Sequence, residues 1–165
     1  MSEIESLSPP DDSQRAEDSL RTYLSARVLE LAAAQLEAYN RASLDEFCAC
    51  YSADVIATRD ESELLCEGVK AFRERYRPMF ERGGFGASVT ERRLEEPSLN
   101  EGGLMSVSCV DSERWWRINE GERSEGEVWV RYHLSFDEDR FLRLRTGEAE
   151  APTIERVEFS SRPLN

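Results

Sequence analysis

The sequence predicts an α+β domain with a mostly antiparallel sheet. Apolar residues recur at helical spacing between residues 18 and 40, whereas residues 104–116 and 127–136 alternate between apolar and polar. Helical segments come first and most strands follow, unlike the regular alternation that builds a parallel sheet. The 165 residues suit one domain with a sizeable core. We expect residues 1–17 to form a flexible acidic tail and residues 18–165 to form the domain.

The first predicted helix is long and amphipathic and ends near Asn40. The residues of its buried stripe are Leu20, Leu24, Val28, Leu31, Gln35 and Tyr39. Ser43 can cap a short second helix over residues 44–51. A third helix over residues 69–82 ends before a glycine pair, and its stripe is aromatic.

The predicted strands lie mainly in the second half of the chain. They cover residues 55–58, 63–68, 86–94, 104–116, 127–136 and 153–161. One face of the fourth strand carries Met105, Val107, Cys109 and Trp115. One face of the fifth carries Val128, Val130, Tyr132, Leu134 and Phe136. Residues 140–145 either extend a strand or belong to a connection. The alternation predicts a sheet that buries one face against the helices.

The composition excludes several classes of partner. A net charge of −13 repels nucleic acid and anionic membrane surfaces. No stretch approaches the roughly 18 apolar residues that span a membrane, and the acidic N-terminus lacks the apolar centre of a signal peptide. We therefore expect a cytoplasmic protein whose cysteines are reduced thiols. These are Cys48, Cys50, Cys66 and Cys109.

The sequence predicts neither a metal site nor a cofactor site. Cys48 and Cys50 diverge on a helix, and the chain has a single histidine. The glycines between residues 83 and 86 follow a helix, whereas the glycines of a phosphate-binding loop open one.

An ordered set of motifs resembles the opening of the SnoaL-like, nuclear transport factor two-like superfamily. The motifs are Tyr39-Asn40, Leu44-Asp45-x-Phe47, Tyr51-x-x-Asp54-Val55, Glu67-Gly68 and Phe72-Arg73-x-x-Tyr76. They cover about residues 30 to 81. The resemblance implies a cystatin-like α+β cone, in which a curved sheet wraps around the long N-terminal helix and leaves a central pocket. It also implies pairing of two chains through the outer face of the sheet.

The superfamily includes ketosteroid isomerases, but this chain departs from their catalytic pattern. The resemblance places Gln35 where those enzymes carry an oxyanion-binding tyrosine, and Arg59 where they carry the base. Asp60 follows one place on, and Tyr132 falls near the position of the second acid. The comparison argues against that isomerase chemistry, while Asp60 and Tyr132 stay candidates for catalysis.

Asp111 is a further catalytic candidate. It lies two residues from Glu113 in a predicted strand, so both carboxylates point the same way. Either they face the core, where burial raises a carboxylate pKa, or the strand leaves the core and both are solvated. Arg131 and His133 share a face of the neighbouring strand, and with the two carboxylates they would suit water activation if that face lined the pocket. Because they alternate with Tyr132, we expect them on the outer face, away from the pocket.

These observations support two hypotheses. The first is a pocket for a small apolar or amphipathic molecule, served by a cofactor-independent isomerase or hydratase chemistry if Asp60, Asp111 and Tyr132 converge. The expected ligand contacts are Gln35, Tyr39, Tyr51, Trp115 and Tyr132. The alternative is a non-catalytic dimeric binding or scaffold module with a vestigial pocket. The residues expected at a homodimer interface are Trp129, Arg131 and His133.

Overall fold

The structure, a computed structural model, describes residues 12–81, 85–100, 103–117 and 123–163. Its helices are α1 (Asp12–Asn40), α2 (Leu44–Ala49), α3 (Val69–Phe80) and α4 (Glu138–Arg145). Its strands are β1 (Tyr51–Arg59), β2 (Glu63–Glu67), β3 (Phe85–Leu94), β4 (Ser98–Leu99), β5 (Met105–Arg117), β6 (Arg123–Leu134) and β7 (Ile154–Ser160). Helices precede most of the strands, as predicted.

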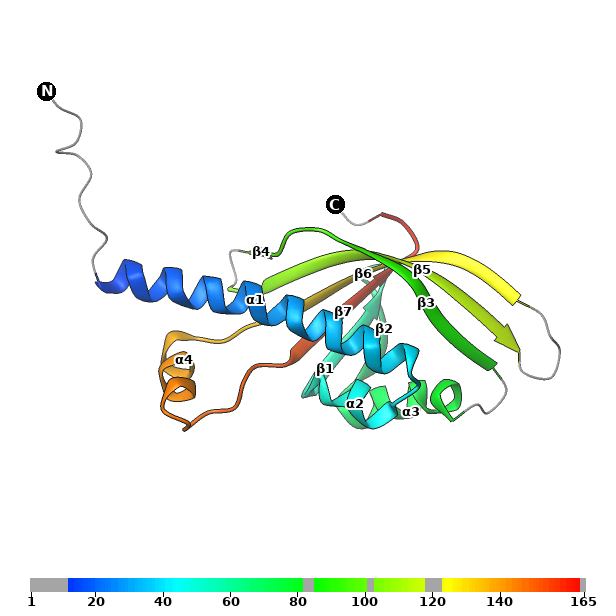
Figure 1. Cartoon of the computed structure of the whole chain (residues 1–165), viewed down its shortest axis with the longest axis horizontal. Coiled ribbons are helices and arrows are strands. Elements are labelled where there is room, and N and C mark those ends of the chain that lie inside the picture. The colour runs from blue at the N-terminus through cyan, green and yellow to red at the C-terminus, as the bar shows by residue number, and fades with distance from the viewer. Residues whose placement is uncertain (1–11, 82–84, 101–102, 118–122, 164–165) are drawn as a thin grey trace, which may run out of the picture.

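The strands form one sheet of seven, in the order β2-β1-β7-β6-β5-β3, and β4 pairs with the first residues of β5. Strands β1 and β7 run parallel, and every other pair in the described part of the chain is antiparallel. The sheet curves around α1, which lies along its concave side, and α2 and α3 gather at the C-terminal end of that helix (Figure 1). The predicted mostly antiparallel sheet around a long N-terminal helix is confirmed.

Helix α1 begins at Asp12, before the predicted start at residue 18. Residues 12–17 are therefore helical, and the rest of the predicted tail, residues 1–11, lies outside the described residues. Arg, Ala and Glu in this segment favour a helix without any burial. No helix in the described ranges is both long and apolar enough to cross a membrane.

The stripe of α1 faces the sheet as predicted. Gln35 and Tyr39 are both buried, one turn apart, at the C-terminal half of the helix. Asn40 then joins α1 to β3: its side-chain amide donates to the carbonyl of Val89 at 3.0 Å and accepts from the Val89 amide at 2.8 Å. This contact lies next to an irregularity in the β3–β5 ladder between Val89 and Glu91. The asparagine thus anchors the helix end and satisfies backbone groups of the bulged strand.

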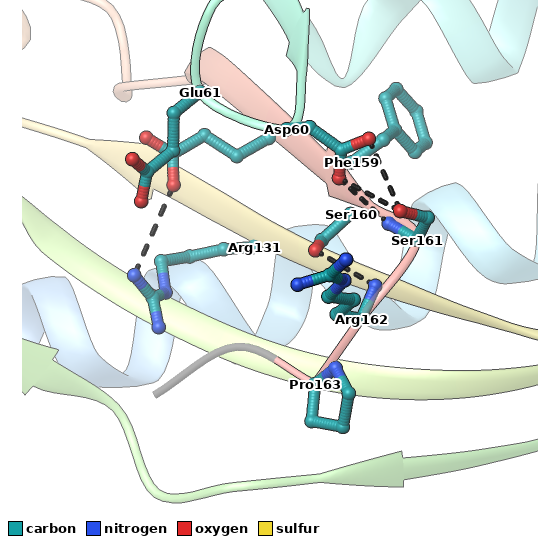
Figure 2. Close-up of a pocket in the computed structure, with 9 residues that line it drawn as sticks. Asp60, Glu61, Arg131, Phe159, Ser160, Ser161, Arg162 and Pro163 are labelled. Atoms are coloured by element: carbon teal, nitrogen blue, oxygen red, sulfur yellow. Dashed lines mark hydrogen bonds and ion pairs between the residues drawn. The ribbon is translucent and has the colours of Figure 1, made fainter.

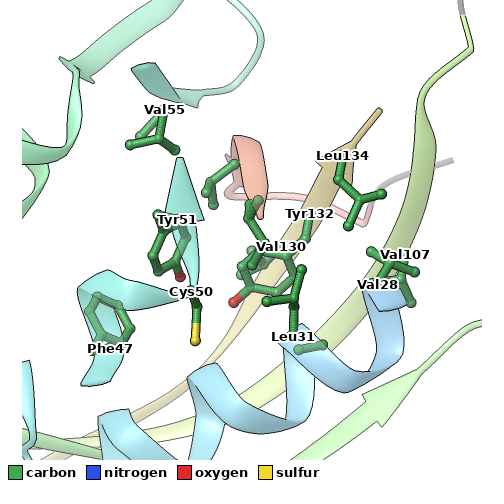
Figure 3. Close-up of a cluster of buried hydrophobic side chains, with 14 of the residues drawn as sticks. Val28, Leu31, Phe47, Cys50, Tyr51, Val55, Val107, Val130, Tyr132 and Leu134 are labelled. Carbon is green, nitrogen blue, oxygen red and sulfur yellow. The ribbon is translucent and has the colours of Figure 1, made fainter. Parts of the chain in front are cut away.

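Between α1 and the sheet lies one apolar core. Alternate residues of β5 and β6 enter it, as predicted, with Val107, Val130 and Leu134 almost fully buried (Figure 3). At the end near α2 and α3 the core becomes aromatic. The ring of Phe47 lies within 6 Å of five other rings, those of Tyr39, Tyr51, Phe72, Tyr76 and Phe80. The four cysteines are buried free thiols.

Residues 140–145 are helical and belong to α4, so the possibility that they extend a strand is wrong. Asp137 caps this helix by accepting from the amide of Arg140 at 2.7 Å. Acidic residues occupy the first turn and basic residues the last, which favours a helix through its dipole. The alternation of Phe, Leu and Arg here is therefore not the pattern of a half-buried strand.

Candidate functional site

A pocket of about 480 Å³ opens where the C-terminal end of α1 meets α3 and the strands β5 and β6. Its lining is Tyr39, Arg59, Leu65, Arg75, Tyr76, Met79, Glu113, Trp115, Glu127, Val128, Phe159, Ser160 and Ser161. The apolar and aromatic side chains make up the walls, and a few charged side chains stand among them. This composition is typical of a site for a small organic ligand.

A tyrosine and a glutamate form the polar contact in this pocket. The hydroxyl of Tyr39 donates to Oε1 of Glu113 at 2.5 Å. The buried stripe of α1 supplies the tyrosine, and the inward face of β5 supplies the glutamate. Among the described residues, Oε2 of Glu113 has no hydrogen-bond partner. One carboxylate oxygen is therefore held in place while the other stays available to a ligand.

Burial shifts the proton affinity of both groups. Desolvation raises the pKa of Glu113 above its ordinary value, and the hydrogen bond from Tyr39 opposes that rise. Desolvation also raises the pKa of Tyr39, and the negative charge of Glu113 adds to the effect. Tyr39 is consequently a neutral hydroxyl that donates a hydrogen bond. The pKa of Glu113 lies closer to neutral pH than that of a solvated carboxyl group.

The ring of Trp115 packs closely over Gly126. A Cβ at Gly126 would lie 3.2 Å from Cζ3 of the Trp115 ring. Trp115 points into the pocket from β5, and the neighbouring Trp116 points outward. The indole therefore forms a wall of the pocket beside Glu113.

Asp111 does not share the open environment of Glu113. Its carboxylate accepts two hydrogen bonds from Arg92, Nε to Oδ1 at 2.6 Å and Nη2 to Oδ2 at 2.7 Å, and both side chains are about 5% exposed or less. Nη2 also donates to the hydroxyl of Tyr132, and Nη1 donates to Gln35 Oε1 and to the carbonyl of Ala32. All five N–H groups of the guanidinium are thus used. The network is closed, which suits a structural role.

The structure separates the predicted site residues into groups. Tyr39 and Trp115 line the pocket, whereas Gln35, Asp111 and Tyr132 bind Arg92 behind it. No metal can be assigned either, because the described part of the chain contains no group of three or more His, Cys, Asp or Glu side chains that could hold one.

Two predicted residues lie elsewhere. Tyr51 belongs to the aromatic core, with its ring 4.3 Å from that of Phe72 (Figure 3 labels Tyr51). Asp60 lies in the turn between β1 and β2 with a positive φ of 49° and binds Ser161. It lines a second, polar pocket of about 520 Å³ together with Arg131 and Arg162 (Figure 2). Asp60, Asp111 and Tyr132 therefore do not meet in one pocket.

The outer face of the sheet carries Trp129, Arg131 and His133, since their neighbours Val130 and Tyr132 are buried in the core. His133 is itself 5% exposed. Its Nδ1 lies 2.6 Å from the hydroxyl of Ser106, and its Nε2 lies 3.4 Å from Glu158. Burial lowers the pKa of His133, although Glu158 opposes this shift. Arg131 and His133 are outside the Glu113 pocket, as expected from the alternation.

Sequence reasoning considered Glu113 beside Asp111 but did not select it, and it missed Arg92. Simple alternation from Val89 places Arg92 on the outer face of β3. The bulge between Val89 and Glu91 changes the alternation, so both Val89 and Arg92 point inward. No local pattern indicated that Arg59 and Arg75 belong to one pocket, because they come from different elements.

No family model matches the chain, and no curated protein matches it. Solved structures do. A ketosteroid isomerase-like protein from Erwinia carotovora has a TM-score of 0.62 at 17% identity, over 84% of this chain and 97% of the other. A protein from Xanthomonas campestris assigned as a polyketide cyclase has a TM-score of 0.54 at 16% identity, over 84% of this chain and 92% of the other.

A third similar structure is an NTF2-like protein with a cystatin-like fold from Novosphingobium aromaticivorans. Its TM-score is 0.56 at 11% identity, over 93% of this chain and 91% of the other. These likenesses confirm the cystatin-like α+β fold that the SnoaL-like, nuclear transport factor 2-like resemblance implied. At such low identity these likenesses show the fold alone, and the chemistry depends on the residues of the site.

Proposed function

We propose that this chain, with its cystatin-like cone, is a cofactor-independent enzyme of isomerase or hydratase type that moves a proton on a small molecule. The observation that carries the proposal is the Tyr39–Glu113 hydrogen bond facing an aromatic pocket. A carboxylate of raised pKa, held by a neutral donor and shielded by apolar walls, suits general-base catalysis near neutral pH. The ketosteroid isomerase-like and polyketide cyclase neighbours support acid–base chemistry of this kind only by analogy.

In the proposed mechanism Glu113 removes a proton from an acidic C–H bond of the ligand and returns it at another atom. The hydrogen bond from Tyr39 fixes Oε1, so Oε2 is the atom that takes the proton. Burial keeps Glu113 partly desolvated, and this raises the affinity of its carboxylate for a proton. Arg92 and Asp111 support the strand from behind and do not touch the ligand.

A neutral carbon acid tests the base directly. In 5-nitrobenzisoxazole a base takes the C3 proton, the C–H electron pair forms the nitrile, and the N–O bond breaks to release the phenolate. We expect the wild-type protein to promote this elimination and Glu113→Gln to lose about 100-fold or more of the rate, as is typical for a positioned base. The absorbance of the phenolate measures the reaction.

The pH profile and a matched variant define the base. The rate should rise with pH through the raised pKa of Glu113, because only the carboxylate accepts the proton. Tyr39→Phe removes a hydrogen bond that lowers this pKa, so the profile should move to higher pH. Glu125→Gln makes the same charge change on the outer face and should keep the wild-type rate. Equal rates for wild type and Glu113→Gln would contradict the proposal and favour the non-catalytic binding module.

We also propose that two copies pair through the outer sheet face. Trp129 is half-buried on this face beside Arg131, and both residue types are enriched at interface hot spots. A large ring on the outside of a charged protein is typical of a covered surface. A twofold axis would place Trp129 of one copy against the same face of the other.

The proposed pairing predicts the effect of a charge at its centre. Trp129→Glu should turn a dimer into a monomer in analytical ultracentrifugation at micromolar concentration, because it buries an unpaired carboxylate in the interface. Leu142→Glu is the matched control, since Leu142 is 59% exposed and lies on α4. A monomeric wild-type protein, or a dimer that survives Trp129→Glu, would show that the pairing is wrong.

A further inference from the structure

We propose that the ligand of the Glu113 pocket is an aromatic or similarly flat apolar molecule that bears a carboxylate, which Arg75 and Arg59 bind at the rim. This inference rests on the proposed function, because it assigns the substrate class of the same pocket. The polar pocket in Figure 2 mixes Arg131 and Arg162 with the carboxylates of Asp60, Glu61 and Glu158, and so favours neither sign of charge.

The arginines of α3 differ in how their charge is used. Arg73 binds Asp45 at 2.6 Å, and Arg77 binds both Glu74 and Glu81 at 2.9 Å or less. Arg75 lines the pocket instead, and in the described ranges no carboxylate lies within 4 Å of its guanidinium. The chain has 34 acidic and 21 basic residues, and the other two arginines of α3 both have acidic partners. The charge of Arg75 is thus available to a ligand.

Arg59 brings a second positive charge to the same rim from β1. Its ion pair with Glu63 is loose, with Nη1 and Oε2 3.7 Å apart, and both side chains are about half exposed. Such a pair is weak and can open to admit another carboxylate. The two arginines line the same pocket from β1 and α3, and in the proposal their guanidinium groups bind one anionic group together.

The inner part of the pocket determines the rest of the ligand. Three aromatic rings belong to the lining, those of Trp115, Tyr76 and Phe159, and Met79, Leu65 and Val128 add apolar side chains. Burial and the charge of Glu113 raise the pKa of the Tyr76 hydroxyl, while Arg75 and Arg59 lower it. The charges of Glu113, Arg75 and Arg59 therefore all act on that hydroxyl. A flat molecule with its carboxylate outward would place its ring carbons toward Glu113.

Because the protein is acidic as a whole, a carboxylate ligand needs local positive charge in order to bind. A net charge of −13 repels a carboxylate ligand in solution. Local positive charge at the mouth offsets that repulsion within about a Debye length, some 10 Å at moderate salt. Glu127 also lines the pocket, but Arg93 lies 3.6 Å from it and offsets part of its charge.

Two isosteric probes separate charge from shape. The planar bicyclic anion 2-naphthoate and its neutral counterpart 2-naphthamide differ only in the group that would meet the arginines. Calorimetric titration should give an affinity for 2-naphthoate about tenfold or more above that for 2-naphthamide, and the ratio should shrink as salt is added. The ratio should fall in Arg75→Gln, and it should reach about one in Arg59→Gln/Arg75→Gln.

Arg73→Gln is the matched control, because it makes the same charge change two residues away on a side chain held by Asp45. It should keep the wild-type ratio. Three outcomes would overturn the inference: a wild-type preference for the amide or none, no binding of either probe, or a preference that persists in Arg59→Gln/Arg75→Gln. The proposed function fails separately, if the elimination of the neutral benzisoxazole does not depend on Glu113. In a protein that passes that test, 2-naphthoate should inhibit the elimination competitively.

Discussion

Asp111→Ala is expected to lower the free energy of unfolding by about 3 to 5 kcal/mol, the usual cost of leaving one partner of a buried ion pair uncompensated. The guanidinium of Arg92 would lose two of its hydrogen bonds while its side chain stays 4% exposed. Urea denaturation of the variant and wild type measures the difference. A loss this large at a residue of the inner face distinguishes a structural carboxylate from a catalytic one.

Replacing both partners provides the control. Arg92→Met/Asp111→Leu removes both charges and fills similar volume, so it should recover most of the stability that Asp111→Ala loses. Glu113→Gln, two residues along the same strand, should cost much less, because Tyr39 can still donate to the amide oxygen. If Asp111→Ala unfolds at the wild-type urea concentration, Asp111 is not part of a closed network.

Phe47→Ala is expected to cost about 3 to 5 kcal/mol as well, through the cavity that it opens. The ring is 1% exposed and contacts Tyr39 at 5.8 Å and Tyr76 at 4.9 Å, measured between centroids. Because both tyrosines line the pocket, their positions should loosen together with the core. The variant should therefore lose both stability in urea and a part of the benzisoxazole elimination rate.

Phe141→Ala is the comparison for that prediction. Phe141 is a half-buried residue of α4 and contacts Tyr23 at a centroid distance of 5.3 Å. Its truncation should cost about 1 kcal/mol, as is common for partly exposed sites, and leave the elimination rate unchanged. An elimination rate that is the same in the two variants would show that the aromatic cluster around Phe47 does not support the pocket.

The fold followed from the sequence where burial repeats with a regular period. Helix α1 and the inward faces of β5 and β6 have such periods, and the structure places Gln35, Tyr39, Val130 and Tyr132 on the predicted faces. The alternation of apolar and polar residues over α4 did not predict its structure. The cap from Asp137 and the distribution of charge along the segment favour a helix instead. Strand β1 begins at Tyr51, before the predicted residue 55, because Tyr51 pairs with Ile154 of β7.

The site was less accessible to sequence reasoning because it joins distant residues. Tyr39 and Trp115 could be placed by face, but their meeting with Arg59 and Arg75 depends on how β1, α3 and β5 pack. Asp60 was selected for its position after the first strand, and the tight turn holds it against Ser161 instead. Asp111 and Glu113 share a face, so only their partners, Arg92 and Tyr39, distinguish them.

The place of β7 in the sheet has a consequence for how the chain is made. Ile154–Ser160 lies between β1 and β6, so of the seven described strands the last to be made joins the early hairpin to the later strands. Until then β1 and β6 each present an unpaired edge, and such edges invite association with other chains. Completion of the sheet must therefore wait for β7, which leaves the growing chain vulnerable to aggregation until residues 154–160 have been made.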